Sequence, residues 1–295
     1  MMHRFQGIYA PIATPFVKGE IDWDALKHNI DFYNKSKLAG LVVLGSNGEF
    51  AMLTYDEKVE LVGFVRKYLR SDKKIIAGSG CESTRETIQL SNSCADVGAD
   101  AALVVTPWYY KDSYKDDVLK AHYTAVADAC VIPVMLYNMP RNAGVNMSSS
   151  LVCELAKHPN IAGVKDSSGD IVQITNIING TPADFSVFAG SASFLYATLA
   201  LGGVGGTLAV ANVLPDLCVG LMEAVQGGRH AEAVAIQCKL MSVNAAVTSR
   251  FGIPGLKKAM DLIGLKGGEP RMPLQPLDDA KTADLKKILA GVGLL

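Results

Sequence analysis

Eight short apolar segments, rich in β-branched residues, recur along this chain of 295 residues. Longer stretches with helical patterns separate them, and two begin with capping-box sequences, "TYDE" at residues 54–57 and "STRE" at 83–86. The apolar segments show no polar alternation, which is typical of parallel strands covered on both faces. Eight such units of about 20 to 35 residues each are what a (β/α)8 barrel requires. We therefore predict an α/β fold, a TIM barrel, with strands within residues 7–16, 40–45, 74–80, 101–107, 131–140, 161–169, 185–190 and 203–213.

The pattern becomes wholly helical after the eighth segment, with helices expected near residues 215–226, 230–247, 254–263 and 278–290. We predict that residues 1–226 form the barrel and that 227–295 are a C-terminal helical extension. No Pro- or Ser-rich linker separates the two parts, which favours a single structural unit. An open doubly wound sheet is the alternative, but no strand is followed by G-x-G-x-x-G with a suitably placed acidic residue.

Charge and hydropathy limit the partners of the chain. The formal net charge of −1 provides no broad attraction for nucleic acid or for an anionic membrane, and there is no long basic run. No stretch has the apolar length of a membrane helix, and the first residues lack the pattern of a signal peptide. We predict a small-molecule partner and a cytoplasmic location.

The cysteines and histidines are scattered without metal-binding spacing. The six cysteines include no C-x-x-C pair, so we interpret them as buried thiols in a reducing compartment. The five histidines show neither H-x-H nor H-E-x-x-H spacing. We therefore expect neither a metal nor another cofactor.

Lys165 interrupts the sixth apolar segment, "IAGVKDSSG". Loops at the carboxyl ends of barrel strands build the active site, so this lysine is expected there. Burial disfavours the ammonium form and makes the neutral amine available to attack a carbonyl. The alternative is a lysine at the barrel rim that pairs with Asp166.

Tyr137 follows "VIPVML" at the mouth of the fifth strand, next to the expected position of Lys165. A phenol held over an imine can move protons to and from the substrate. The alternative is a core aromatic residue with a satisfied hydroxyl group. Only the proximity to Lys165 favours the catalytic interpretation.

"GSNGEF" at residues 45–50 ends the second strand with small and polar residues. Backbone N–H groups in a glycine-flanked turn can point at a carboxylate, and the side chains of Ser46 and Asn47 can add donors. A plain turn between strand and helix explains the glycines as well. We expect Glu49 to bond backbone groups of the loop and give it no chemical role.

Four motifs in order, "GSNGE", "TPWYY", "YNMP" and "GVKDS", resemble the dihydrodipicolinate synthase and N-acetylneuraminate lyase family of class I aldolases. The resemblance extends over nearly the whole chain. "GSGCEST", "NAAVTSRFGIPGLKKAMD" and "RMPLQPL" are most similar to the 4-hydroxy-2-oxoglutarate aldolase branch. The resemblance implies a TIM barrel, a lysine that forms a Schiff base with a 2-oxo acid, no metal, and a homotetramer.

The resemblance also implies roles for individual residues. The Schiff-base lysine falls on Lys165 and the proton-transferring tyrosine on Tyr137. Ser46 and Tyr109 match the hydroxyls of the proton relay, in which a neighbouring subunit often supplies the tyrosine, and Tyr110 replaces Tyr109 if the loop register differs by one. The contacts to the bound oxo acid fall on Ser46, Asn47, Ser167 and Gly190.

Departures from the family pattern separate the possible reactions. Dihydrodipicolinate synthases usually carry two threonines at the positions of Ser46 and Asn47, and an arginine that binds a second carboxylate at the position of Asn142. Here Arg141 stands one residue earlier, and we expect the slip to aim it elsewhere. We predict cleavage of 4-hydroxy-2-oxoglutarate to pyruvate and glyoxylate. The alternatives are condensation of pyruvate with aspartate semialdehyde, a related sugar-acid aldolase or dehydratase, and a non-catalytic sensor of 2-oxo acids.

Overall fold

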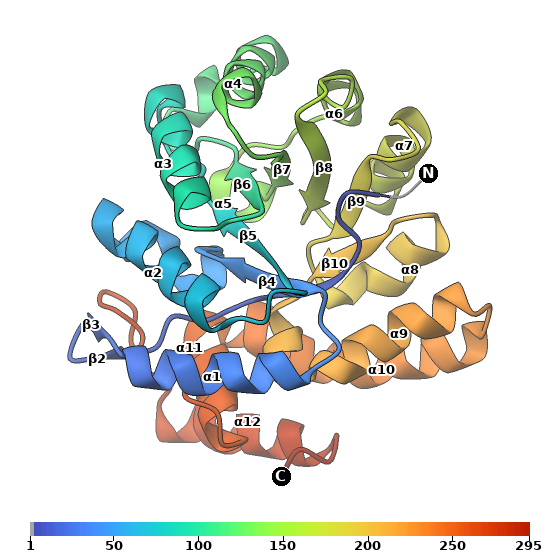
Figure 1. The fold of residues 1–295 in the computed structure, drawn as a ribbon. Coiled ribbons are helices and arrows are strands. Elements are labelled where there is room, and N and C mark those ends of the chain that lie inside the picture. Colours follow the sequence, from blue (N-terminus) through green and yellow to red (C-terminus); the bar gives the residue numbers. More distant parts are fainter. Residues whose placement is uncertain (1–2) are drawn as a thin grey trace.

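Eight parallel strands close into a barrel in the computed structural model, which describes residues 3–295 (Figure 1). Neighbours around the barrel follow the order β1-β10-β9-β8-β7-β6-β5-β4. The predicted TIM barrel is therefore confirmed, and each strand lies within the segment expected for it. The strands are β1 Gly7–Pro11, β4 Gly40–Val43, β5 Lys74–Gly78, β6 Ala101–Val105, β7 Val134–Asn138, β8 Ile161–Asp166, β9 Ser186–Ala189 and β10 Gly205–Thr207.

Helices surround the barrel and connect successive strands (Figure 1). They are α1 Trp23–Lys35, α2 Tyr55–Tyr68, α3 Thr84–Asp96, α4 Asp116–Ala129, α5 Pro140–Ala143, α6 Ser149–Leu155, α7 Ile171–Gly180, α8 Leu195–Ala200 and α9 Pro215–Gln226. A small hairpin, β2 Phe16–Val17 with β3 Glu20–Ile21, was not expected from the sequence. It is too short for its apolar pattern to be distinguished from that of the preceding strand.

The two capping sequences differ in the structure. Thr54 and Glu57 form a complete capping box at the start of α2, since each side chain accepts a hydrogen bond from the other's backbone N–H. At the start of α3, Ser83 Oγ accepts a hydrogen bond from Glu86 N, whereas the Glu86 side chain accepts none from Ser83 N. Both sequences therefore mark true helix starts, but only "TYDE" is reciprocal.

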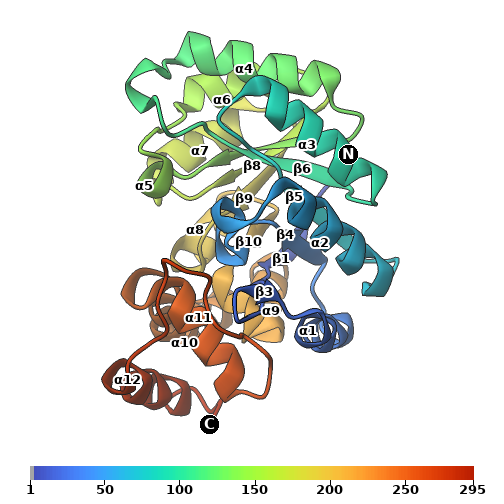
Figure 2. The same ribbon diagram turned by 90° about the vertical axis from the view of Figure 1, so that its left-hand side faces the viewer.

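A helical C-terminal extension follows α9, as predicted, and gathers beside α1 and α9 at one end of the molecule (Figure 2). It comprises α10 His230–Ala245, a π-helical turn at Ala246–Arg250, α11 Gly252–Leu262 and α12 Asp279–Ala290. The Asn29 side chain on α1 donates to Lys266 O and accepts from Lys266 N, which fastens the extension to the barrel. The division at residue 226 stays a prediction.

The barrel interior is filled by side chains, so the strands form a packed core below the site. Tyr9 and Phe188 meet inside it with ring centroids 5.5 Å apart. No helix among residues 3–295 is long and apolar enough to span a membrane.

All six cysteines are free. Four are buried as expected, but Cys153 is half-buried and Cys238 is exposed on α10. The prediction of buried thiols is therefore wrong for these two, because the helices that carry them turn those positions towards the surface.

Candidate active site

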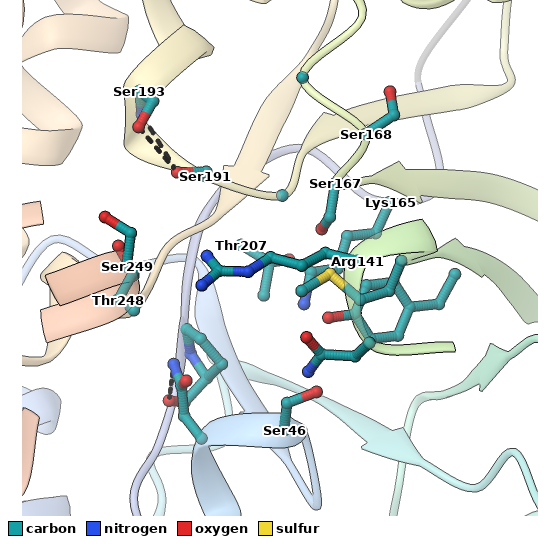
Figure 3. Close-up of a pocket in the computed structure, with 18 of the residues that line it drawn as sticks. Ser46, Arg141, Lys165, Ser167, Ser168, Ser191, Ser193, Thr207, Thr248 and Ser249 are labelled. Carbon is teal, nitrogen blue, oxygen red and sulfur yellow. Dashed lines mark hydrogen bonds between the residues drawn. The ribbon is translucent and has the colours of Figure 1, made fainter. Parts of the chain in front are cut away.

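A cavity of about 420 Å³ opens at the carboxyl ends of the barrel strands (Figure 3). Residues from the strand ends, from the loops that follow and from the C-terminal extension line it. Of the residues selected from the sequence, the cavity wall brings together Ser46, Asn47, Tyr137, Lys165, Ser167 and Gly190.

Lys165 lies near the end of β8 with only 4% of its surface exposed. Its partner on the neighbouring strand β7 is Tyr137, and Lys165 Nζ lies 3.9 Å from the centroid of the Tyr137 ring. Among residues 3–295 no carboxylate oxygen lies within 4.0 Å of this amine. The structure therefore presents a buried side-chain amine that has no carboxylate partner.

Asp166 points to the other side of the sheet, because successive strand residues alternate between faces. Its carboxylate accepts hydrogen bonds from Asn138 Nδ2 at 2.8 Å, Gln173 Nε2 at 3.0 Å and Ser168 N at 2.8 Å. The alternative in which Asp166 pairs with Lys165 is therefore wrong. Instead, the Asn138–Asp166 bond ties β7 to β8 beside the Tyr137–Lys165 contact.

Tyr137 is 6% exposed, and it packs in the buried cluster inside the barrel while also bordering the cavity. Burial by itself would raise the pKa of its phenol, but the charge of Lys165 and the polar groups of Ser46, Lys165 and Ser167 outweigh burial and lower that pKa. The phenol is thus better suited to exchange protons than an ordinary buried tyrosine.

Ser46 and Asn47 lie in a single 3-10 turn, Ser46–Gly48, directly after β4. The turn is closed on one side by Glu49, whose φ of 59° lies in the left-handed region, and Thr14 Oγ1 donates to Gly48 O. Both side chains remain partly accessible at the cavity. The turn therefore presents polar groups to the cavity that Lys165 also lines, and Figure 3 shows Ser46 at its wall.

Gly190 provides space for Ser167. A Cβ atom at position 190 would lie 1.9 Å from Ser167 Oγ and 2.7 Å from Asp166 O. The Ser167 hydroxyl has no hydrogen-bond partner within residues 3–295. It nevertheless lies close enough to the Tyr137 phenol to help lower the pKa of that group, and it remains available to a ligand in the cavity.

Tyr109 is the one predicted site residue that lies away from the cavity. It is 75% exposed and stacks edge-on against the exposed Tyr110, with centroids 5.0 Å apart. Glu82 holds the backbone of this loop by accepting hydrogen bonds from Trp108 N and Tyr109 N. Within one chain neither tyrosine reaches Lys165, so the relay role of Tyr109 stays a prediction that needs a neighbouring subunit.

The cavity includes residues that the sequence did not reveal. Arg141, on the short helix α5, extends across the middle of the pocket in Figure 3 and makes no ion pair with any residue of 3–295. The expectation that its position aims it elsewhere is wrong, because α5 turns both Arg141 and Asn142 towards the cavity. Thr248 and Ser249 come from the π-helical turn of the extension. Such turns often mark functional sites, but sequence periodicity does not reveal them.

No group of three His, Cys, Asp or Glu side chains in the described part of the chain is placed to hold a metal ion. A (β/α)8 barrel with an unneutralised amine in a polar cavity has the arrangement of an enzyme that acts on carbonyl compounds through a covalent imine.

Comparison with known proteins gives the family. Residues 4–291 match the dihydrodipicolinate synthetase family. The 4-hydroxy-tetrahydrodipicolinate synthase of Methanoculleus marisnigri is 38% identical over 98% of this chain and 100% of its own, and that of Archaeoglobus fulgidus is 36% identical over 99% of both chains. The crystal structure of dihydrodipicolinate synthase from Thermotoga maritima superposes with a TM-score of 0.95, at 30% identity, over 99% of this chain and 100% of that one.

The chain belongs to the dihydrodipicolinate synthetase family. It is an enzyme of the pyruvate-dependent class I aldolase type, a carbon–carbon lyase. The family resemblance seen in the sequence is thus confirmed. The names of the relatives support the synthase alternative better than the 4-hydroxy-2-oxoglutarate aldolase that the sequence analysis ranks first.

Proposed function

We propose that this enzyme condenses pyruvate with aspartate semialdehyde, as the names of its relatives suggest, through an imine between pyruvate and Lys165. The observation that carries the proposal is the Lys165 amine, buried without an acidic partner and 3.9 Å from the Tyr137 ring at the cavity. No metal or other cofactor takes part in this scheme.

The reaction begins when the neutral Lys165 amine adds to C2 of pyruvate and forms a carbon–nitrogen bond. The former carbonyl oxygen takes two protons, one of them from the adding amine, and leaves as water, which produces an iminium. Loss of a proton from C3 gives an enamine, whose C3 then bonds to the aldehyde carbon while the aldehyde oxygen takes a proton. Hydrolysis of the iminium, or attack by the amine of the product, releases Lys165.

Tyr137 is the proton carrier in this proposal. Its lowered pKa, caused by Lys165 and the nearby polar groups against the effect of burial, suits both donation to the leaving hydroxyl and recovery of the proton. Ser46 and Asn47 hold the carboxylate of pyruvate, and this contact places C2 within reach of the amine. Ser167 contributes its hydroxyl, which fits beside Gly190 because that residue has no side chain.

A relay from Tyr137 through Ser46 to Tyr109 requires a second chain. We propose a homotetramer in which a neighbouring subunit supplies Tyr109, or Tyr110 beside it, because both rings are exposed in a single chain. Six free cysteines suit a cytoplasmic location, which we retain as part of the proposal.

The position of Arg141 at the cavity is compatible with the synthase reaction. Aspartate semialdehyde carries its own carboxylate, and the unpaired guanidinium of Arg141 at the cavity can form two parallel hydrogen bonds with it. An arginine aimed away from the cavity would count against the synthase, and the place of Arg141 at the cavity wall therefore supports the proposal.

Cleavage of 4-hydroxy-2-oxoglutarate to pyruvate and glyoxylate is the second candidate. Asn142 favours it, since this amide occupies the position where the sequence analysis places the synthase arginine and it also lines the cavity. The distal carboxylate of this substrate can use Arg141 as well, so Arg141 alone does not separate the two reactions.

The test measures both reactions on the same preparation, with Lys165→Arg as the blank. Pyruvate consumption that depends on aspartate semialdehyde and disappears in the blank supports the synthase. Pyruvate release from 4-hydroxy-2-oxoglutarate without such consumption supports the aldolase. Absence of both reactions, or equal rates in the blank, would contradict the proposed function.

A further inference from the structure

Lys257, on α11 of the C-terminal extension, is a second buried lysine near the cavity but outside it. Its side chain is 1% exposed, and its Nζ lies 2.5 Å from Glu49 Oε1. The same amine donates to Glu269 O at 2.7 Å and lies 4.5 Å from the centroid of the Phe16 ring. The proposed reaction does not involve this ion pair. Its place, between the Ser46–Asn47 turn and the C-terminal extension, suggests a role in the geometry of the cavity.

Glu49 connects the ion pair to the turn that carries Ser46 and Asn47. Its backbone N–H donates to Ser46 O at 3.2 Å and closes the 3-10 turn, and its left-handed φ of 59° is unusual for a residue other than glycine. The side chain is fully buried, and its second oxygen accepts a hydrogen bond from Arg271 N at 2.8 Å. The direction of the turn is therefore set by a carboxylate that two parts of the extension hold.

The other end of the contact also reaches the cavity. Gly252 and Ile253 form the first turn of α11 and line the cavity, while Lys257 lies one turn further along the same helix. The preceding π-helical turn brings Thr248 and Ser249 to the same wall. The Lys257–Glu49 pair thus joins two walls of one cavity, the carboxylate-binding turn and the extension.

We propose that Lys257 is a positioning residue that, through Glu49, holds the Ser46–Asn47 turn at the distance from Lys165 at which a 2-oxo acid binds. The inference rests on the proposed function, because it concerns the affinity of the same site for pyruvate. Lys257 itself touches neither substrate nor the reacting atoms.

The test compares Lys257→Met, Glu49→Gln, the double variant of both, and Lys257→Arg. Pyruvate is trapped on the protein with borohydride, and the half-saturating pyruvate concentration is measured together with the melting temperature. Removing one partner leaves a buried charge unpaired, whereas removing both charges restores much of the stability. The double variant therefore separates a loss of stability from a loss of pyruvate affinity.

We expect the half-saturating pyruvate concentration of the double variant to rise by about tenfold to a hundredfold, because small misplacements of binding groups have effects of this size. The trapping rate at saturating pyruvate should change little, since Lys165 and Tyr137 are untouched. Lys257→Arg should remain closer to wild type, because arginine can still pair with Glu49.

A double variant that regains stability and also binds pyruvate with wild-type affinity would overturn the positioning role. Replacing the exposed pair of Lys287 and Asp284 on α12 of the same extension is the matched control and should change neither quantity. If the wild-type protein traps no pyruvate, the proposed function fails and this inference with it. If the wild-type protein traps pyruvate and the double variant has the same affinity for it, this inference fails while the proposed function stands.

Discussion

Two lysines are buried close to the same turn of this barrel, and their surroundings assign them opposite roles. Lys165 faces the cavity and has no carboxylate within 4.0 Å in the described part of the chain. Lys257 is closed off from solvent and pairs with Glu49 at 2.5 Å. Burial lowers the pKa of Lys257 against the opposing influence of Glu49, and its amine is held by Glu49 Oε1 and by Glu269 O. Burial by itself therefore does not distinguish the two lysines; the open cavity at Lys165 and its lack of an acidic partner do.

The largest effect is expected at Lys165. Lys165→Arg should fold normally and lose essentially all turnover, because a guanidinium does not form an imine with a 2-oxo acid. Activity is followed by pyruvate consumption or release. Lys73→Arg is a matched control, since Lys73 is also buried but donates only to Ser36 O and Leu38 O, away from the cavity. Substantial activity in the Lys165 variant would remove the distinction between the two lysines.

The second prediction concerns stability, for which we expect the larger loss at Lys257 and the smaller one at Lys165. Lys257→Met should lower the free energy of unfolding by about 3 to 5 kcal/mol, because it leaves the Glu49 carboxylate buried and unpaired. Lys165→Met breaks no ion pair and should cost far less. Denaturant unfolding of both variants measures the difference. Equal destabilisation by the two substitutions would contradict the assignment of Lys257 to the scaffold.

Tyr137→Phe should retain the fold and react more slowly, by about a hundredfold if proton transfer limits the rate. The ring still packs beside Lys165, so only the hydroxyl is tested. Single-turnover trapping of pyruvate separates imine formation from later steps. A near-normal rate would show that Tyr137 contributes packing alone.

The smallest effect is expected at Glu57, which pairs with Arg271. The backbone N–H of Arg271 donates to Glu49, the partner of Lys257. Hydrogen bonds from Arg271 are the main cause that lowers the pKa of Glu57 to about 2, against the effect of burial. A lowered pKa stabilises the fold above the unfolded value of 4.5 and ceases to do so as pH falls through about 2. Glu57→Gln keeps the helix cap, so its loss of stability relative to wild type should be on the order of 1 kcal/mol at pH 7 and vanish near pH 2.

Unfolding of wild type and the Glu57 variant across this pH range checks that prediction. A difference that stays constant from pH 7 to pH 2 would show that the Arg271 pair does not act through charge.

The sequence predicted those parts of the molecule that local patterns determine. Continuous apolar segments located all eight strands, and a lysine that interrupts one of them indicated Lys165. Tyr137 was found because neighbouring parallel strands bring their carboxyl ends together. The bond between Arg271 N and Glu49, 222 positions apart, was not predictable, because no local pattern relates two such distant residues.

The direction of side chains on short loop helices was not predictable from the sequence either. A four-residue helix, α5, turns Arg141 into the cavity, and a shift of one residue was expected to turn it away. Helical positions differ in direction by about 100°, so such a shift matters only once the axis of the helix is known. The sequence shows Arg141 but not the direction of the α5 axis. The preference for one of the two reactions depended on that direction.

The most direct measurement is reductive trapping of pyruvate followed by mapping of the modified residue by mass spectrometry. We expect one reduced pyruvate adduct per chain, on Lys165, and none on Lys257 or Lys73. An adduct on another lysine, or none at all with protein that is folded, would contradict the central claim that the unneutralised amine of Lys165 is the nucleophile.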